Sequence, residues 1–185
     1  MMTLEAGAML VAGTELNDSN FKRSVILLCE HGEPGSFGLV LNRPLELKLA
    51  DVTQGADIFF DAPVFLGGPV QPNTLHVLHT KPLDNLGESS EVVPGVYWGS
   101  DFEKVRDALN QKKVSPSEFR FFLGYAGWGA GQLAGEVAEA AWILAQGLKE
   151  FVFDFPPEKL WSAVLRRMGG DYAILANTPE DLRLN

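Results

Sequence analysis

The segment from Phe21 to Cys29 is nearly continuous apolar sequence after Arg23. An alternating pattern would indicate a strand with one face in water, whereas an unbroken apolar run indicates a strand that is covered on both faces. A turn cluster follows at residues 31–35, and a second apolar run spans Phe37–Leu41. The two runs predict a hairpin over residues 24–42 within a sheet that is buried on both sides.

The rest of the chain places strands early and its better helices late. Strands are predicted at residues 64–66, 75–79, 96–98, 119–123, 142–144 and 150–155, and residues 82–95 are predicted to form a polar surface loop. Helices are predicted at residues 47–52, 101–112 (with a Ser100–Glu103 capping box), 131–139 and from 156–157 to a stop at 169–170. This order predicts an α+β fold rather than an alternating parallel α/β sheet, in one domain over residues 1–185.

Charge and cysteine usage narrow the function classes. The net charge is −9, and basic residues never run longer than pairs such as Lys22-Arg23. Proteins that bind DNA neutralise phosphates with clustered Lys and Arg, so direct nucleic-acid binding is disfavoured. A single cysteine cannot form an internal disulfide, and no signal peptide or membrane span is visible, so we expect a cytoplasmic protein.

The first candidate site is Cys29-Glu30-His31, at the end of the buried strand. If that strand extends to His31, Cys29 and His31 share one face, because side chains alternate. A thiol beside an imidazole can ionise and become nucleophilic or redox-active. The alternative is that Cys29 is a small buried hydrophobe and His31 a turn residue.

The second candidate is the glycine-rich run from Gly124 to Gln132, expected to be a loop between a strand and a helix. Exposed backbone N–H groups there could bind an anion, although the match to G-x-G-x-x-A lacks the repeated βαβ units of a dinucleotide fold. The alternative is a tight turn whose glycines let Tyr125 and Trp128 pack closely. Gln132 and Glu136 share a helix face that is either aimed at this loop or solvated.

The sequence shows no residue pattern that is typical of a metal or cofactor site. His76 and His79 are three apart on a strand, which puts them on opposite faces and makes them a poor metal pair. No Cys/His/Asp cluster has metal-ligand spacing, and no lysine completes a nucleotide P-loop. We therefore expect neither a metal nor a cofactor.

Several segments together resemble one bacterial family, and they occur in the same order along nearly the whole chain. They are Ser24–His31, Gly38–Pro44, Leu66–Val70, Leu78–Thr80 and Gly124–Trp128 with Gly131–Leu133 and Glu136. The chain is similar in these motifs to the YqgE/AlgH family. The resemblance implies a compact α+β fold with a small, mostly antiparallel, barrel-like or bifurcated sheet surrounded by helices. One branch of that family carries the name of a transcriptional regulator of alginate production.

Three hypotheses for function follow. The first is a non-enzymatic regulatory protein that binds a small molecule or a protein partner and acts indirectly on gene expression. The second is a thiol-dependent activity or redox sensor at Cys29, and the third is direct DNA binding. The first predicts that the motif segments converge on a single polar recess, with these ligand-binding residues: Asn42, Arg43, Gly67, Gly68, Pro69, His79, Gly124, Tyr125, Gly127, Trp128, Gln132 and Glu136.

Overall fold

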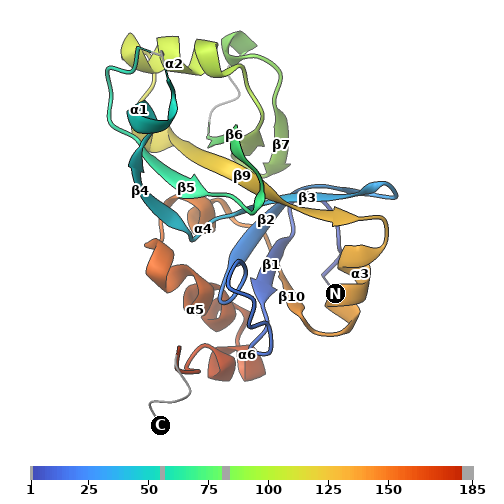
Figure 1. Ribbon diagram of the computed structural model, residues 1–185. Coiled ribbons are helices and arrows are strands. Elements are labelled where there is room, and N and C mark those ends of the chain that lie inside the picture. The colour runs from blue at the N-terminus through green and yellow to red at the C-terminus, as the bar shows by residue number, and fades with distance from the viewer. Residues whose placement is uncertain (1, 55–56, 81–83, 181–185) are drawn as a thin grey trace.

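In the part of the chain that the structure describes, ten strands form a largely antiparallel network (Figure 1). The computed structural model describes residues 2–54, 57–80 and 84–180. The strands are β1 (Met9–Ala12), β2 (Val25–Gly32), β3 (Gly35–Val40), β4 (Pro44–Lys48), β5 (Pro63–Leu66), β6 (Val70–His79), β7 (Ser90–Val93), β8 (Val96–Trp98), β9 (Phe119–Gly129) and β10 (Trp142–Ala145). Their order is β10-β1-β2-β3-β9-β6-β8-β7, and β4 pairs with β5, which pairs in parallel with β9.

Six helices surround this network in the described part of the chain. They are α1 (Leu49–Val52), α2 (Phe102–Asn110), α3 (Gln132–Ala138), α4 (Lys149–Phe153), α5 (Pro157–Met168) and α6 (Gly170–Leu175). Strands dominate the first half and helices the second, which confirms the predicted α+β class. The predicted hairpin is formed by β2 and β3.

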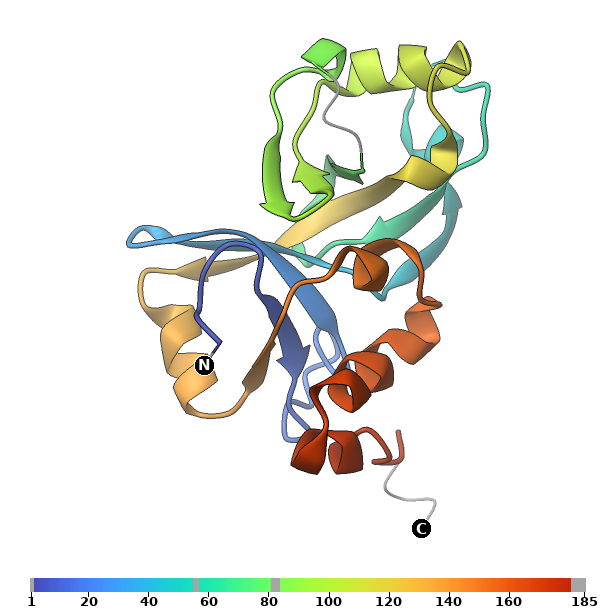
Figure 2. The same ribbon diagram turned by 180° about the vertical axis from the view of Figure 1, so that it is seen from behind.

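Strand β9 joins two lobes that are visible from both sides of the molecule (Figures 1 and 2). Its first half pairs with β5 and β6 in the upper lobe of Figure 1, and its second half pairs with β3 in the lower lobe. The upper lobe has its own apolar core, in which Val105 and Leu109 of α2 pack with Phe119 and Phe121. Successive side chains of β9 point to opposite faces of the sheet, and the strand passes from one lobe to the other. It therefore contributes side chains to different cores.

The sheet of the lower lobe is buried on both faces, as the apolar run predicts. Leu27 and Cys29 face a core that contains Trp161 of α5, whereas Ile26 and Leu28 face a core that contains Trp128. Helices α4, α5 and α6 cover the first face, and α3 lies against the second (Figure 2). Covering each buried side chain of this size stabilises the fold by about 1.5–3 kcal/mol.

The predicted strand at residues 150–155 is wrong, because residues 149–153 form the short helix α4. Phe151 is buried, and its ring packs on Phe155 at a centroid distance of 5.5 Å. The guanidinium of Arg120 donates a 2.7 Å hydrogen bond to the Phe153 carbonyl, satisfying one of the helix-terminal acceptors. Tertiary packing and this hydrogen bond outweigh the alternating pattern.

Two further expectations need correction. Within the predicted loop at 82–95, of which residues 82 and 83 lie outside the described residues, Ser90–Val93 form edge strand β7. Helix α2 is capped by Asp101, whose carboxylate accepts from the Glu103 and Lys104 N–H groups, rather than by Ser100. The predicted end of the last long helix is confirmed, because α5 ends at Met168 and Gly169 caps it; helix α6 then begins at Gly170.

Candidate functional site

The glycine-rich run is part of a strand and not a loop, because β9 continues unbroken to Gly129. At its middle, Gly124 has a φ of +71°, and a Cβ there would lie 2.4 Å from the Gly68 carbonyl oxygen. Gly67 and Gly68 are equally tight: a Cβ on Gly68 would lie 2.1 Å from the Tyr125 carbonyl carbon. These three residues, here called the glycine junction, let the turn between β5 and β6 press against β9, with exposed Pro69 following.

Tyr125 and Trp128 do not line one recess, because they project from opposite faces of β9. The Tyr125 ring stacks on Phe37 at 4.5 Å, whereas Trp128 is buried with Trp142 in the core beneath α3. A Cβ on Gly127 would lie 3.3 Å from the Tyr125 ring, so a glycine suits the packing of that ring. The predicted convergence of the motif segments on a single polar recess is therefore wrong.

The polar residues of α3 reach back to β9 and β10. A single Glu136 oxygen accepts hydrogen bonds from both indole N–H groups, at 3.4 Å from Trp128 and 3.2 Å from Trp142. The Gln132 side-chain oxygen accepts from the Gly129 N–H at 3.0 Å. The two residues thus anchor the helix to the sheet, Glu136 through partly buried donors and Gln132 through an exposed one.

The two histidines of β6 lie on opposite faces, as their spacing predicts. His79 is fully buried between the rings of Tyr97 and Phe119, each at 5.8 Å, and its Nε2 lies 3.0 Å from the Gly99 carbonyl oxygen. His76 packs edge-on against Phe37, and burial lowers its pKa. His79 is therefore held within the structure and offers no surface for a ligand.

Cys29 and His31 do not act on each other. A bulge interrupts the β2–β3 pairing between Leu28 and Glu30, so Cys29 stays inside while Glu30 and His31 are exposed. Cys29 is 4% exposed, and burial, with a smaller contribution from the Glu30 charge, raises the pKa of its thiol. His31 Nδ1 instead lies 2.7 Å from the Ser36 hydroxyl. A protonated, enclosed thiol argues against the redox hypothesis.

Asn42 and Arg43 hold a neighbouring segment in place. The Asn42 side chain accepts from the Val25 N–H at 3.0 Å and donates to the Arg23 carbonyl at 2.9 Å. The Arg43 guanidinium donates to the Lys22 carbonyl. Burial lowers the pKa of Arg43, and the nearby Glu180 carboxylate opposes that shift. These two motif residues therefore position the backbone of residues 22–23.

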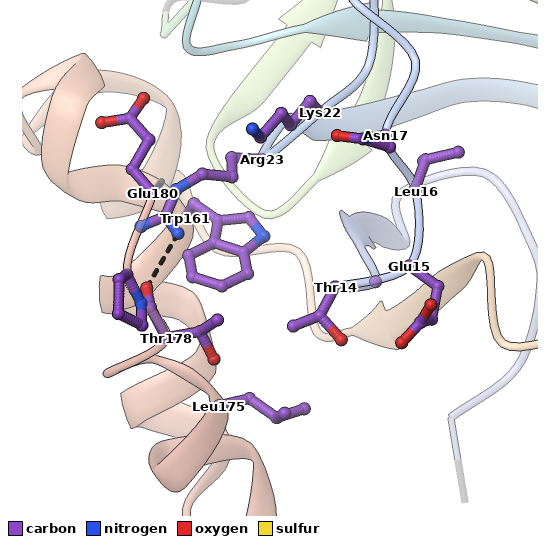
Figure 3. A pocket seen from close by; sticks show the side chains of 12 residues that line it. Thr14, Glu15, Leu16, Asn17, Lys22, Arg23, Trp161, Leu175, Thr178 and Glu180 are labelled. Atoms are coloured by element: carbon purple, nitrogen blue, oxygen red, sulfur yellow. Dashed lines mark hydrogen bonds between the residues drawn. The ribbon is translucent and has the colours of Figure 1, made fainter. Parts of the chain in front are cut away.

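Residues 22–23 form part of the wall of a pocket of about 820 Å³ (Figure 3). The other walls come from the loop after β1, from α5 and from the segment around and after α6. The lining residues are Gly13, Thr14, Glu15, Leu16, Asn17, Lys22, Arg23, Trp161, Leu175, Thr178, Pro179 and Glu180. None of the residues proposed from sequence lines this pocket, although Lys22-Arg23 is a visible basic pair and Trp161 a visible apolar residue of the last long helix.

Arg23 is the most constrained side chain of the pocket. Its backbone has a φ of +56°, an uncommon value for a non-glycine residue. Its guanidinium lies 4.1 Å from the centre of the Trp161 ring, and its Nη1 donates to the Thr178 carbonyl at 3.0 Å. The Trp161 indole is fixed in turn by donation to the Ala12 carbonyl at 2.9 Å. Among the described residues no other protein acceptor takes the remaining N–H groups of Arg23, which leaves them available to a ligand.

The described residues also meet the requirements of neither a metal site nor a membrane-spanning helix. Across residues 2–54, 57–80 and 84–180, no three His, Cys, Asp or Glu side chains are placed to hold a metal ion. No helix in these ranges is long and apolar enough to cross a membrane.

Known proteins resemble this chain over nearly its full length. A family model described as AlgH-like matches residues 9–173. The chain belongs to the AlgH-like family. A UPF0301 protein of Chlorobaculum parvum is 47% identical over 177 residues, covering 96% of this chain and 94% of the relative. A UPF0301 protein of Chlorobium luteolum is 46% identical over 182 residues, covering 98% and 95%.

Solved structures give the AlgH-like chain the same architecture. The solution structure of the AlgH protein from Pseudomonas aeruginosa matches with a TM-score of 0.74 and 31% identity, over 98% of this chain and 100% of that one. A crystal structure of a Corynebacterium diphtheriae protein matches in fold with a TM-score of 0.75 and 23% identity, over 96% and 94%. The expected family is confirmed.

Proposed function

We propose that this chain is a non-enzymatic regulatory protein that binds a small ligand in the Arg23–Trp161 pocket and acts on gene expression indirectly, without contacting DNA. The observation that supports this most is the fixed position of Arg23, which has N–H groups that no described residue accepts and borders a pocket of about 820 Å³. Pockets of about 300–1,000 Å³ are the usual size for small molecules and cofactors.

The charge of the chain supports the indirect route. A net charge of −9 repels a phosphate backbone, and binding to DNA normally requires a clustered basic surface. A ligand-bound form that contacts another protein avoids this repulsion. The expected result with a labelled random duplex at low salt is no change in fluorescence anisotropy.

The experiment for the binding function uses the four tryptophans as reporters. The labelled chain is titrated with the polar small-molecule fraction of a bacterial extract, and the indole N–H resonances are followed by NMR. The expected result is a saturable shift of the Trp161 resonance with little change at Trp128 and Trp142, which share Glu136 away from the pocket.

A variant that fills the pocket provides the control. Thr14→Trp places a bulky ring in the lining and should abolish the shift at Trp161, whereas Thr3→Trp, at an exposed position outside the lining, should preserve it. An unchanged Trp161 resonance in the wild-type chain, or a shift that survives Thr14→Trp, would contradict the proposed function.

A further inference from the structure

We infer that the pocket takes a small organic anion, whose carboxylate or phosphate group contacts Arg23 and whose apolar body lies in the space beside Trp161. This inference rests on the proposed function and names the class of ligand. It follows from three observations: the position of the fixed guanidinium, the balance of charges around it, and the apolar side chains of the lining.

The guanidinium is held ready for an oxyanion. Stacking on Trp161 fixes the plane of the Arg23 fork, and the hydrogen bond from Nη1 to the Thr178 carbonyl fixes its rotation. A planar fork of this kind matches the two oxygens of a carboxylate or phosphate and binds them with little further loss of side-chain entropy. Asn42 and Arg43 hold the backbone beneath it, so the cation is preorganised.

The charges around Arg23 favour an anion. Lys22 lies beside it in the lining, and Arg43 contacts the same segment from behind. Two carboxylates also face the pocket. Glu180 interacts with Arg43 and extends away from the space between Trp161 and Thr14, while Glu15 lies on the opposite wall (Figure 3). The lining therefore carries two cations, Lys22 and Arg23, and two carboxylates, and Arg43 behind the wall offsets the charge of Glu180.

The remaining lining fits an apolar body. Leu16 and Leu175 contribute aliphatic side chains on either side of the pocket, and Thr14 and Thr178 contribute hydroxyl groups to the lining (Figure 3). A bare inorganic ion would leave most of a volume of about 820 Å³ empty. An anion with a ring or a short chain would fill it and remove apolar surface from water.

The test compares four probes by the shift of the Trp161 indole resonance: phenyl phosphate, benzoate, benzamide and inorganic phosphate. Phenyl phosphate or benzoate should bind at least about tenfold more tightly than benzamide, since the neutral amide lacks the charge that a guanidinium recognises. The stronger of the two anions identifies the acidic group. Inorganic phosphate should bind more weakly than phenyl phosphate, because it lacks the apolar body.

Variants test whether Arg23 carries the recognition. Arg23→Gln should weaken the better anion about tenfold, and Lys22→Gln should weaken it by a smaller factor of about two. Arg106→Gln, in the upper lobe, should leave binding unchanged. The Trp128 and Trp142 resonances report whether each variant is folded. If Arg23→Gln is not, the response to Lys22→Gln and the probe series decide the outcome.

Each remaining outcome contradicts a specific part of the inference or of the proposed function. Equal binding of benzamide and the anions would contradict the anion class while leaving a small-molecule pocket intact. Equal binding of inorganic phosphate and phenyl phosphate would contradict the apolar body. Failure of all four probes, in a chain whose Trp161 still responds to the bacterial extract, would overturn the inference and spare the proposed function. Failure of the extract as well would overturn both.

Discussion

The glycine junction and the Arg23 pocket use their residues in opposite ways. At the junction, Gly67, Gly68 and Gly124 contribute backbone alone, and their lack of a side chain allows two segments to touch. At the pocket, Arg23 and Trp161 contribute side chains on a scaffold fixed by Asn42 and Arg43. A conspicuous glycine motif can therefore specify how strands cross, while the groups able to bind a ligand lie in less conspicuous parts of the sequence.

The largest expected effect is at the junction. Gly68→Ala should lower the free energy of unfolding by about 3 kcal/mol or more, because the added Cβ would meet the Tyr125 backbone at 2.1 Å and the local φ is +156°. Urea unfolding followed by circular dichroism measures this. A decrease in the free energy of unfolding below about 0.5 kcal/mol, the usual range for neutral surface changes, would show that the two segments are not tightly packed at the glycine junction. The contrast between the junction and the pocket would then not hold.

The next largest effect concerns Cys29, the motif residue that was proposed to be reactive. Its enclosure and raised pKa predict that a thiol reagent reacts with the native chain on the order of a hundredfold more slowly than with the chain in urea. The measurement is the rate of labelling between pH 7 and 9. Rapid native labelling that titrates near about 8.5, the value of a free thiol, would revive the redox hypothesis.

A moderate effect is expected at Asn42, the motif residue that holds the pocket wall. Asn42→Ala should cost about 2 kcal/mol of stability, since it leaves the buried Val25 N–H without its acceptor and frees the Arg23 carbonyl. It should also weaken binding of the better anionic probe, because residues 22–23 lose an anchor. Asn20→Ala, at an exposed position, is the matched control and should change neither quantity. Loss of stability with unchanged binding would separate the scaffold from the pocket.

The smallest effect separates tight glycines from permissive ones. Gly135 lies within α3, and a Cβ there would meet nothing within 4 Å. Gly135→Ala should therefore raise the free energy of unfolding by about 0.5–1 kcal/mol, the usual helix-propensity difference. The same urea titration measures it. A destabilisation here would imply that the steric reasoning applied to Gly68 is unsound.

Much of the fold follows from local pattern. The run in β2 predicts a strand covered on both faces, and the stripe on α5 with prolines at its start predicts that helix, because burial and capping act through neighbouring residues. Prediction from sequence fails where contacts with residues distant along the chain determine the local structure. Arg120 and Phe155 stabilise α4 against a strand-like pattern, and residues 126–129 pair with β3 despite their glycines.

The site is harder to predict from sequence than the fold. The pocket combines the loop after β1, residues 22–23, Trp161 and the segment around and after α6, so no local spacing marks it. Asn42 and Arg43 were identified from the family motif, but they contact the backbone of the pocket wall and do not line the pocket themselves. Their hydrogen bonds to the Arg23 and Lys22 carbonyls connect the motif to the site.

A crystal structure of the chain soaked with phenyl phosphate tests the contrast between scaffold and site most directly. The predicted density has the phosphate against the Arg23 guanidinium and the phenyl ring between Trp161 and Thr14, with the glycine junction unchanged. Phenyl phosphate bound instead at the turn of Gly67 and Gly68, or an empty pocket when the probe is seen elsewhere, would contradict the assignment of ligand binding to Arg23.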